Sequence, residues 1–212
     1  MKATPAHDDA AGTGQPEIDA SKCVFINCPF DEEYAPLLDA MIMAVVCCGF
    51  IPRSSIESGD VAEPRMNRVM RAVFGSRYSI HDLSRCKGEG VGNLARFNMP
   101  LELGVAMARR YLDDRQHDWL ALVPDRVDYG SFASDLAGFD LMRHNGTVFG
   151  VVTATMAWLI TRGGAVQLAS PKKVAAKVPD FGRRRALLSA KWGGYPPWMH
   201  VVDIAVRIAA RL

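Results

Sequence analysis

The stretch CVFINCPFDEEYAPLLDAMIMAVVCCG, residues 23–49, carries the pattern of a strand, an acidic loop and a helix. Residues 23–27 form a short apolar run closed by a Cys-Pro pair, which is typical of a buried strand. Residues 31–33 are acidic, as the N-terminus of a helix favours. The apolar run 37–46 then predicts that helix, and Gly49 ends it.

The same alternation continues through residue 123, which predicts an α/β domain with a parallel sheet and helices on its faces. The further strands are expected at 50–56, 77–83 and 119–123, and the further helices at 63–75 and 98–111. Beyond residue 123 the alternation weakens. There the patterns predict a helix at 148–161, a linker or irregular segment at 163–179, and two helices at 183–192 and 199–212.

Composition excludes several protein classes. Of the 212 residues, 49% are hydrophobic and 23% are charged, which are average globular values and argue against collagen-like, disordered and coiled-coil chains. The formal net charge of +2 gives no support to a nucleic-acid partner. It leaves room for a small anionic ligand, because a few arginines can gather at one cleft: Arg53, Arg65, Arg85 and Arg96.

No stretch of the sequence predicts a membrane protein. Residues 1–20 lack the apolar stretch of a signal peptide and are interpreted as a disordered leader. The most apolar run, 37–51, contains Asp39 and is too short to span a bilayer. The five cysteines have no zinc-binding spacing and indicate reduced thiols. We therefore expect a cytoplasmic protein with no membrane partner and no metal site.

The carboxyl ends of the strands are the expected place for a ligand, because open parallel sheets bind ligands there. The rule selects the loop after the first strand, the loop after the third strand and the start of the helix at 98–111. The residues expected to bind a substrate are Asn27, Cys28, Pro29, Phe30, Asp31, Asp82, Ser84, Arg85 and Asn98.

Glu102 is the candidate catalytic residue. We expect it in the first turn of its helix, where the helix dipole favours the ionised carboxylate. An ionised carboxylate in a partly apolar pocket suits cleavage of an N-glycosidic bond through an oxocarbenium-like transition state. The alternative is that Glu102 only complements the helix dipole.

The neighbouring candidates have structural alternatives as well. Asp82 can hold ribose hydroxyls or cap the loop that follows it. Arg85 can meet a phosphate or remain a surface charge. His81 points to the opposite face from Asp82 and is expected to be a satisfied core histidine. Phe30 can stack on a base or belong to the core.

Other familiar chemistries are disfavoured by the sequence. Gly88, Gly90 and Gly92 do not form the dinucleotide-binding fingerprint, and they indicate a mobile loop that can act as a lid. Cys28 and Cys86 end adjacent strands, yet no histidine has a spacing that argues for a thiol nucleophile. Asp135, Asp140 and His144 can in principle bind a metal, but this region is better interpreted as a turn.

Three motifs resemble one group of bacterial proteins. VFINCPFDEEY (24–34), RYSIHDLSR (77–85) and RFNMPLELGVA (96–106) are similar to the TIR-like, nucleoside 2-deoxyribosyltransferase-like Rossmannoid domains. The resemblance extends over about residues 22–162. It implies a flavodoxin-like parallel sheet of four or five strands over residues 21–162, after the leader at 1–20 and before a helical extension at 163–212.

The resemblance also implies an activity. The family's helix-borne glutamate attacks the anomeric carbon of ribose and maps onto Glu102, and its sugar-contacting acid maps onto Asp82. The chain is thereby expected to be an NAD nucleosidase that acts as an effector in bacterial defence or signalling. NAD is then its substrate, no cofactor is needed, and a second copy or a defence-system protein is a conceivable partner. The alternatives are a nucleoside deoxyribosyltransferase or nucleotide N-glycosidase, and a non-enzymatic nucleotide-sensing or adaptor domain.

Overall fold

The chain alternates strands and helices before it ends in three successive helices. The computed structural model describes residues 18–57, 62–85, 98–114, 116–131 and 133–212. The strands are β1 Cys23–Asn27, β2 Ile51–Arg53, β3 Tyr78–Asp82, β4 Asp118–Pro124 and β5 Met142–His144. The α-helices are α1 Ala35–Cys47, α2 Arg65–Phe74, α3 Asn98–Leu112, α4 Val148–Leu159, α5 Pro171–Lys191 and α6 Trp198–Ala209. Three short 3₁₀ helices lie at Ala20–Lys22, Tyr129–Ser131 and Ser134–Gly138.

The five strands form one parallel sheet with the order β2-β1-β3-β4-β5. The chain moves from β1 to β2 at one edge and then returns past β1 to β3, so the strand order reverses between β1 and β3. This is the predicted flavodoxin-like α/β architecture, with five strands. The carboxyl ends of β1 and β3 mark the point where ligands bind in sheets of this kind.

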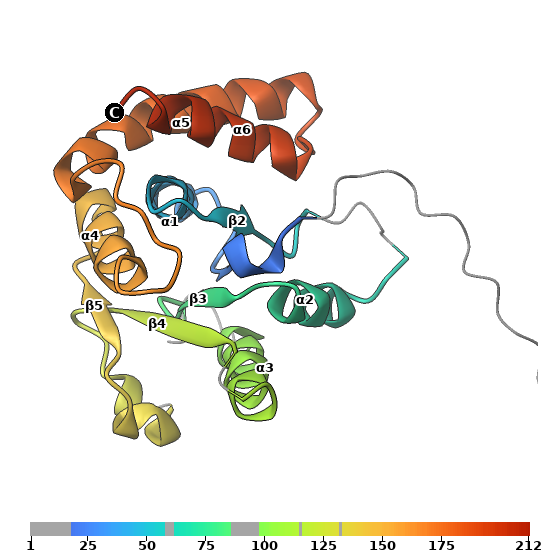
Figure 1. The fold of residues 1–212 in the computed structure, drawn as a ribbon, viewed down its shortest axis with the longest axis vertical. Coiled ribbons are helices and arrows are strands. Elements are labelled where there is room, and N and C mark those ends of the chain that lie inside the picture. The colour runs from blue at the N-terminus through green and yellow to red at the C-terminus, as the bar shows by residue number, and fades with distance from the viewer. Residues whose placement is uncertain (1–17, 58–61, 86–97, 115, 132) are drawn as a thin grey trace, which may run out of the picture.

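Helices cover both faces of the sheet (Figure 1). α2 and α3 pack together on one face, whereas α1 and α4 pack together on the other. α5 and α6 form an outer layer over α1. Because α1 is enclosed between the sheet and this outer layer, all its residues from 38 to 47 are buried.

The linker or irregular segment predicted at 163–179 is wrong from residue 171 onward, because α5 begins at Pro171. Proline is tolerated at the first helical position, and Ser170 precedes it as the N-cap residue. Pro179 lies inside this helix. The buried side chains of Val174, Val178 and Phe181 pack in the same hydrophobic core as α1, and this tertiary packing overrides the local signal of the proline.

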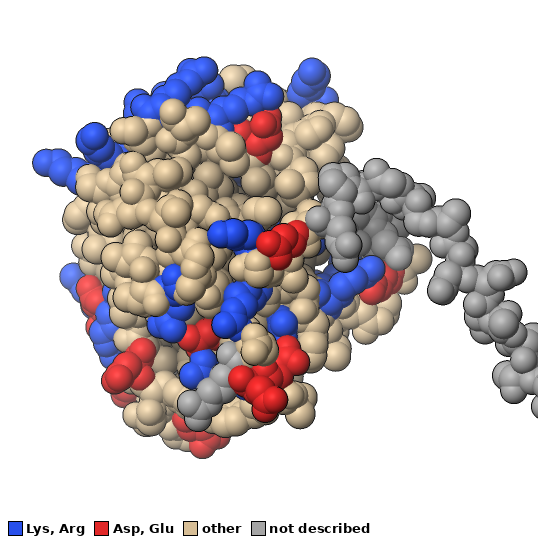
Figure 2. Space-filling view, in the orientation of Figure 1, with Lys and Arg blue, Asp and Glu red and all other residues tan. Residues whose placement is uncertain are grey.

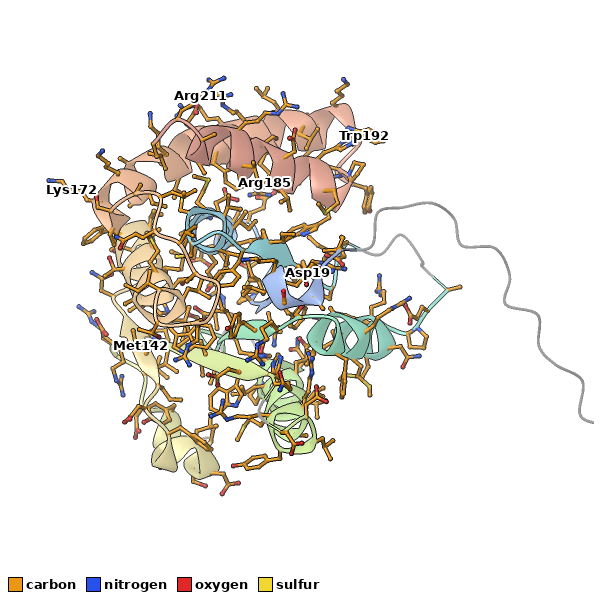
Figure 3. The ribbon with its side chains drawn as sticks, viewed as in Figure 1. Asp19, Met142, Lys172, Arg185, Trp192 and Arg211 are labelled. Carbon is orange, nitrogen blue, oxygen red and sulfur yellow. The ribbon has the colours of Figure 1, made fainter. Side chains whose placement is uncertain are left out.

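The three consecutive arginines at 183–185 differ in their surroundings. Arg183 and Arg184 pair with Asp180 on the exposed face of α5, where Lys and Arg side chains gather over α5 and α6 (Figure 2). Arg185 instead lies between α5 and α1 (Figure 3). Its Nε donates to the buried carboxylate of Asp39 at 2.6 Å, so this arginine helps to attach the outer layer to α1.

Gly49 turns the chain from α1 into β2 and sets up a prediction on stability. Its φ is +80°, a left-handed conformation, and a Cβ there would lie 2.5 Å from Val166 Cγ2. We expect Gly49→Ala to lower the free energy of unfolding by about 2 kcal/mol or more, because backbone strain adds to this clash. Urea denaturation measures the effect.

Gly146 provides the matched control, since its φ is +75° and a Cβ there would meet no atom within 4 Å. Gly146→Ala should show the backbone strain alone. Equal losses in the two variants would contradict the expected steric role of Val166.

Among the helices that the structure describes, none has both the length and the apolar character needed to cross a membrane.

Candidate functional site

A pocket of about 400 Å³ lies between the loop after β1 and α5, where Phe30, Asp31, Arg185 and Ser189 are among its lining residues. Two further pockets open at the carboxyl edge of the sheet, and the same loop contributes to both. We name them after the helix whose N-terminal end each one meets. The α3-side pocket has a volume of about 390 Å³ and is lined by Cys28, Pro29, Phe30, Asp31, Arg65, Asn98 and Met99. The α4-side pocket has a volume of about 370 Å³ and is lined by Glu33, Tyr34, Pro36, Leu37, Ser84, Arg85, Pro124, His144, Gly146 and Val148.

Glu102 lies directly behind the wall of the α3-side pocket. Its side chain is 1% exposed, and its Oε1 accepts a hydrogen bond from Arg65 Nη1 at 2.7 Å. Arg65 and Asn98 line the pocket, whereas Glu102 is not among the lining residues. Glu102 Oε2 has no hydrogen-bond partner among the described residues. A buried carboxylate oxygen without a partner is unfavourable, and a ligand group can satisfy it.

Two opposing influences set the charge of Glu102. Burial raises the pKa of Glu102 above its usual value, and the positive charge of Arg65 and the Asn98 side chain lower this pKa in part. Arg65 therefore favours the ionised carboxylate that glycosidic cleavage needs.

The predicted position of Glu102 in the first helical turn is wrong. α3 begins at Asn98, so Glu102 is its fifth residue and starts the second turn. Asn98, a predicted substrate-binding residue, is the first residue of this helix. The helix dipole acts mainly within the first turn, so Arg65 is the main partner of this carboxylate. The interpretation of Glu102 as a simple complement to the dipole is correspondingly weaker.

Negative charge converges on Cys28. The carboxylates of Asp82, Asp31 and Glu102 each raise the pKa of the Cys28 thiol, which burial already raises well above its usual range. The thiol therefore stays protonated and is a poor nucleophile. The same negative field stabilises a positively charged group in the α3-side pocket, such as a ribose that is becoming an oxocarbenium ion.

A buried chain of hydrogen bonds fixes the amide of Asn27. Asn27 Nδ2 donates to His81 Nδ1 at 3.1 Å, His81 Nε2 lies 2.9 Å from Ser79 Oγ, and Ser79 Oγ lies 2.9 Å from His117 Nε2. Burial lowers the pKa of His81 to about 3 and that of His117 to about 4, so both rings are neutral. His81 is thus the satisfied core histidine that the sequence predicted. Asn27 Oδ1 has no partner among the described residues.

Asp82 faces the opposite side of the sheet from Asn27 and His81. Its Oδ1 accepts from the backbone N–H of Ser84 at 2.7 Å, which is the loop-capping role that the sequence left open. Its Oδ2 lies 3.2 Å from His144 Nε2, at the end of β5. Asp82 and Ser84 therefore belong with the α4-side pocket, while Glu102 belongs with the α3-side pocket.

Of the residues that line the α4-side pocket, the sequence predicted only Ser84 and Arg85, and it missed the two buried polar side chains there, Tyr34 and His144. Tyr34 is 3% exposed, and its hydroxyl lies close to Asp82 and Ser84 without a hydrogen bond of ordinary geometry to a described residue. His144 was considered only for metal binding or thiol catalysis. Its Nδ1 accepts from the backbone N–H of Gly146 at 3.1 Å, which places the proton of the neutral ring on Nε2, toward Asp82. The sequence signal was weak, because β5 is only three residues long.

The arginines of the sequence prediction gather only in part. Arg65 lines the α3-side pocket, and Arg85 lines the α4-side pocket, where it pairs with Asp31 and Glu33. Arg53 instead binds Glu57 and contacts Cys23 at the start of β1, away from this edge.

Phe30 is 38% exposed and lines the α3-side pocket, so its ring is accessible for stacking on a base.

Several sequence predictions lie outside the described residues: the lid glycines Gly88, Gly90 and Gly92, and also Cys86 and Arg96. Within the described part of the chain, no three His, Cys, Asp or Glu side chains are grouped so that they can hold a metal ion.

Together these features define a flavodoxin-like α/β protein with two pockets at the reversal point of its sheet. Searches against protein-family models and against curated proteins found no significant match to the chain. The functional assignment therefore depends on the side chains at these two pockets.

Proposed function

We propose that this protein cleaves the N-glycosidic bond of a nucleotide, with NAD as the leading substrate and Glu102 as the catalytic residue. One observation carries the proposal: Glu102 is buried, is held by Arg65 of the α3-side pocket, and has one oxygen without a hydrogen-bond partner among the described residues. A carboxylate in this setting stabilises positive charge that develops on a ribose ring. The role of this protein as a defence or signalling effector is part of the same proposal.

The chemistry needs no metal and no general acid. The bond between C1′ and the pyridinium nitrogen breaks, and its electron pair leaves with the nitrogen, so nicotinamide departs neutral. The ribose becomes an oxocarbenium ion, which the Glu102 carboxylate stabilises. Water then adds to C1′ and loses a proton to solvent, which yields ADP-ribose.

The remaining residues of the α3-side pocket bind and orient the substrate. Phe30 offers a partly exposed ring for stacking, and Asp31 offers acceptors for ribose hydroxyls. Asn27 lines neither pocket, although its buried Oδ1 has no partner among the described residues. Arg65 is a positioning residue, because it holds Glu102 through Oε1 and leaves Oε2 for the reacting sugar.

The role of Arg65 predicts a change in pH dependence. Removing its positive charge in Arg65→Gln should raise the pKa of Glu102 further above its usual value. The acid limb of the kcat/KM profile should then move to higher pH, so that activity is lost several-fold more at pH 6 than at pH 8. A pH series of nicotinamide release measures this, and an unchanged acid limb would contradict the role of Arg65.

One observation favours a second candidate function. Glu102 is not among the lining residues of the pocket, and Arg65 holds one of its two oxygens. This arrangement also suits a domain that binds a nucleotide without cleaving it.

A single experiment separates the candidates. The full chain is incubated with NAD and with a panel of nucleoside monophosphates, and the products are identified by mass spectrometry. Nicotinamide from NAD supports the proposal, and free base from the panel supports a deoxyribosyltransferase or nucleotide N-glycosidase. Thermal stabilisation by a nucleotide without turnover supports a sensing domain.

A further inference from the structure

The α4-side pocket is a second cavity that the proposed cleavage does not use. Ligand pockets usually measure about 300–1,000 Å³, and each pocket at this edge is near the lower limit, at about 390 and 370 Å³. A dinucleotide therefore needs more room than either pocket offers alone. The two pockets share the loop after β1, at the point where dinucleotides bind across sheets of this type.

Arg85 lies at the boundary between the two pockets. Its Nη2 is 3.2 Å from Asp31 Oδ1 and 2.7 Å from Glu33 Oε2. Asp31 lines the α3-side pocket, whereas Arg85 and Glu33 line the α4-side pocket. Glu33 is 82% exposed, so its hold on Arg85 competes with water. A phosphate offers a guanidinium a stronger, bidentate partner than these two carboxylates do.

The α4-side pocket also contains donors that suit an anion. Gly146 and Val148 place its wall at the start of α4, where the helix dipole is positive. Tyr34 gives an independent observation, because its buried hydroxyl lies at this pocket close to Asp82 and Ser84 and makes no hydrogen bond of ordinary geometry to a described residue. Ser84 adds a second hydroxyl at the same wall.

We propose that the α4-side pocket is a second half-site that makes the protein selective for dinucleotides. The nicotinamide riboside occupies the α3-side pocket beside Glu102, and the adenosine half occupies the α4-side pocket. Arg85 exchanges Asp31 and Glu33 for the bridging phosphates. This assignment rests on the proposed cleavage of NAD.

The distribution of charge fits this division of the substrate. The carboxylates of Asp31 and Glu102 favour the cationic nicotinamide riboside on the α3 side and repel phosphate from it. The carboxylate of Asp82 lies on the other side, where it pairs with His144. Arg85, the start of α4 and the hydroxyl groups favour phosphate on the other side. A dinucleotide with a positively charged end and a diphosphate in its middle matches both regions.

The test compares three substrates of decreasing size: NAD, nicotinamide mononucleotide and nicotinamide riboside. KM is measured through nicotinamide release by the full chain. Arg85→Gln should raise KM for the two phosphate-bearing substrates about tenfold relative to nicotinamide riboside, because only they carry the group that Arg85 recognises. Val148→Tyr, which narrows the α4-side pocket, should raise KM for NAD relative to both smaller substrates.

Glu33→Gln should have the opposite effect on KM. It should lower KM for NAD, because it removes a carboxylate that competes with the phosphates for Arg85. Arg183→Gln is the control and should leave KM unchanged, since Arg183 is exposed on α5 and pairs with Asp180. Equal effects of Arg85→Gln on all three substrates would overturn the half-site.

The same variants separate this inference from the proposed function. If nicotinamide is released but the ratios of KM among the three substrates are the same in the variants and the wild-type protein, the half-site is contradicted and the proposed cleavage is not. If no substrate is cleaved, calorimetric binding of NAD and nicotinamide riboside by the wild-type protein and Arg85→Gln still decides the half-site. Equal affinities of the two proteins for NAD would overturn it.

Discussion

Glu102→Gln is expected to lower nicotinamide release from NAD by about 10²–10³-fold while the protein remains folded. Glutamine keeps the shape of the side chain and an oxygen that can accept from Arg65, so the local packing survives. It removes the negative charge that stabilises the oxocarbenium ion. The rate of release under saturating NAD measures the loss, and circular dichroism confirms the fold.

The chain offers a matched control for this variant. Glu63 lies just before α2 and pairs with Arg71. Its side chain is 19% exposed, and it lines neither pocket. Glu63→Gln should therefore retain the activity of the wild-type protein. Full activity in Glu102→Gln, or an equal loss in both variants, would contradict the role assigned to Glu102.

Stability should separate Glu102→Gln from a simple folding defect. Burial disfavours the charged form of Glu102, and glutamine removes that charge. Arg65 is 42% exposed, so water can solvate its guanidinium when the ion pair is lost. We therefore expect the Tm of Glu102→Gln to stay within about 4 °C of the wild-type value, which corresponds to about 1 kcal/mol or less.

The largest effect on stability is expected at Arg185. Arg185→Met should lower the free energy of unfolding by about 3 kcal/mol, because it leaves the carboxylate of Asp39 buried without its partner. The Arg185 side chain is 25% exposed, which places the effect at the lower end of the range for buried pairs. Methionine keeps the apolar contacts of the arginine stem. Urea denaturation measures the loss.

Arg184→Met is the control for the charge change alone. Arg184 pairs with Asp180 on the exposed face of α5, and exposed pairs contribute about 0–1 kcal/mol. A similar loss in both variants would show that Arg185 has no special role in attaching α5 to α1.

The loss in free energy of unfolding caused by Arg185→Met, called the deficit below, should also depend on pH. Burial raises the pKa of Asp39 above its usual 3.8, and Arg185 lowers it in part, so removal of Arg185 raises this pKa further. A native pKa above the unfolded value makes the native state bind more protons, and stability then falls as pH rises through that window. The deficit should consequently shrink as pH falls from 7 toward 4. A deficit that stays constant with pH would contradict this origin.

Local patterns predicted most of the sheet. β1 matches its expected range, and β3, β4 and α3 differ from theirs by one or two residues at an end, because short apolar runs and glycine or proline boundaries are local signals. The rule for the carboxyl edge placed the candidate residues at an edge where the structure has pockets. It did not predict that they divide between two pockets.

The unpredicted features depend on contacts between distant residues. Glu102 and Arg65 are 37 positions apart, and Asp82 meets His144 only because β5 lies beyond β4 in the sheet. The proline inside α5 suggested a linker, whereas packing against α1 stabilises a helix there. None of these pairings has a periodic signature in the sequence, so they required the structure.

The most direct test of the proposed mechanism is a mass-spectrometric time course of the full chain with NAD. The mechanism predicts that nicotinamide and ADP-ribose appear in equal amounts with the wild-type protein and with Glu63→Gln. It predicts that both products fall to about 1% or less of that rate with Glu102→Gln. Intact NAD in all three reactions, or undiminished cleavage by Glu102→Gln, would contradict it.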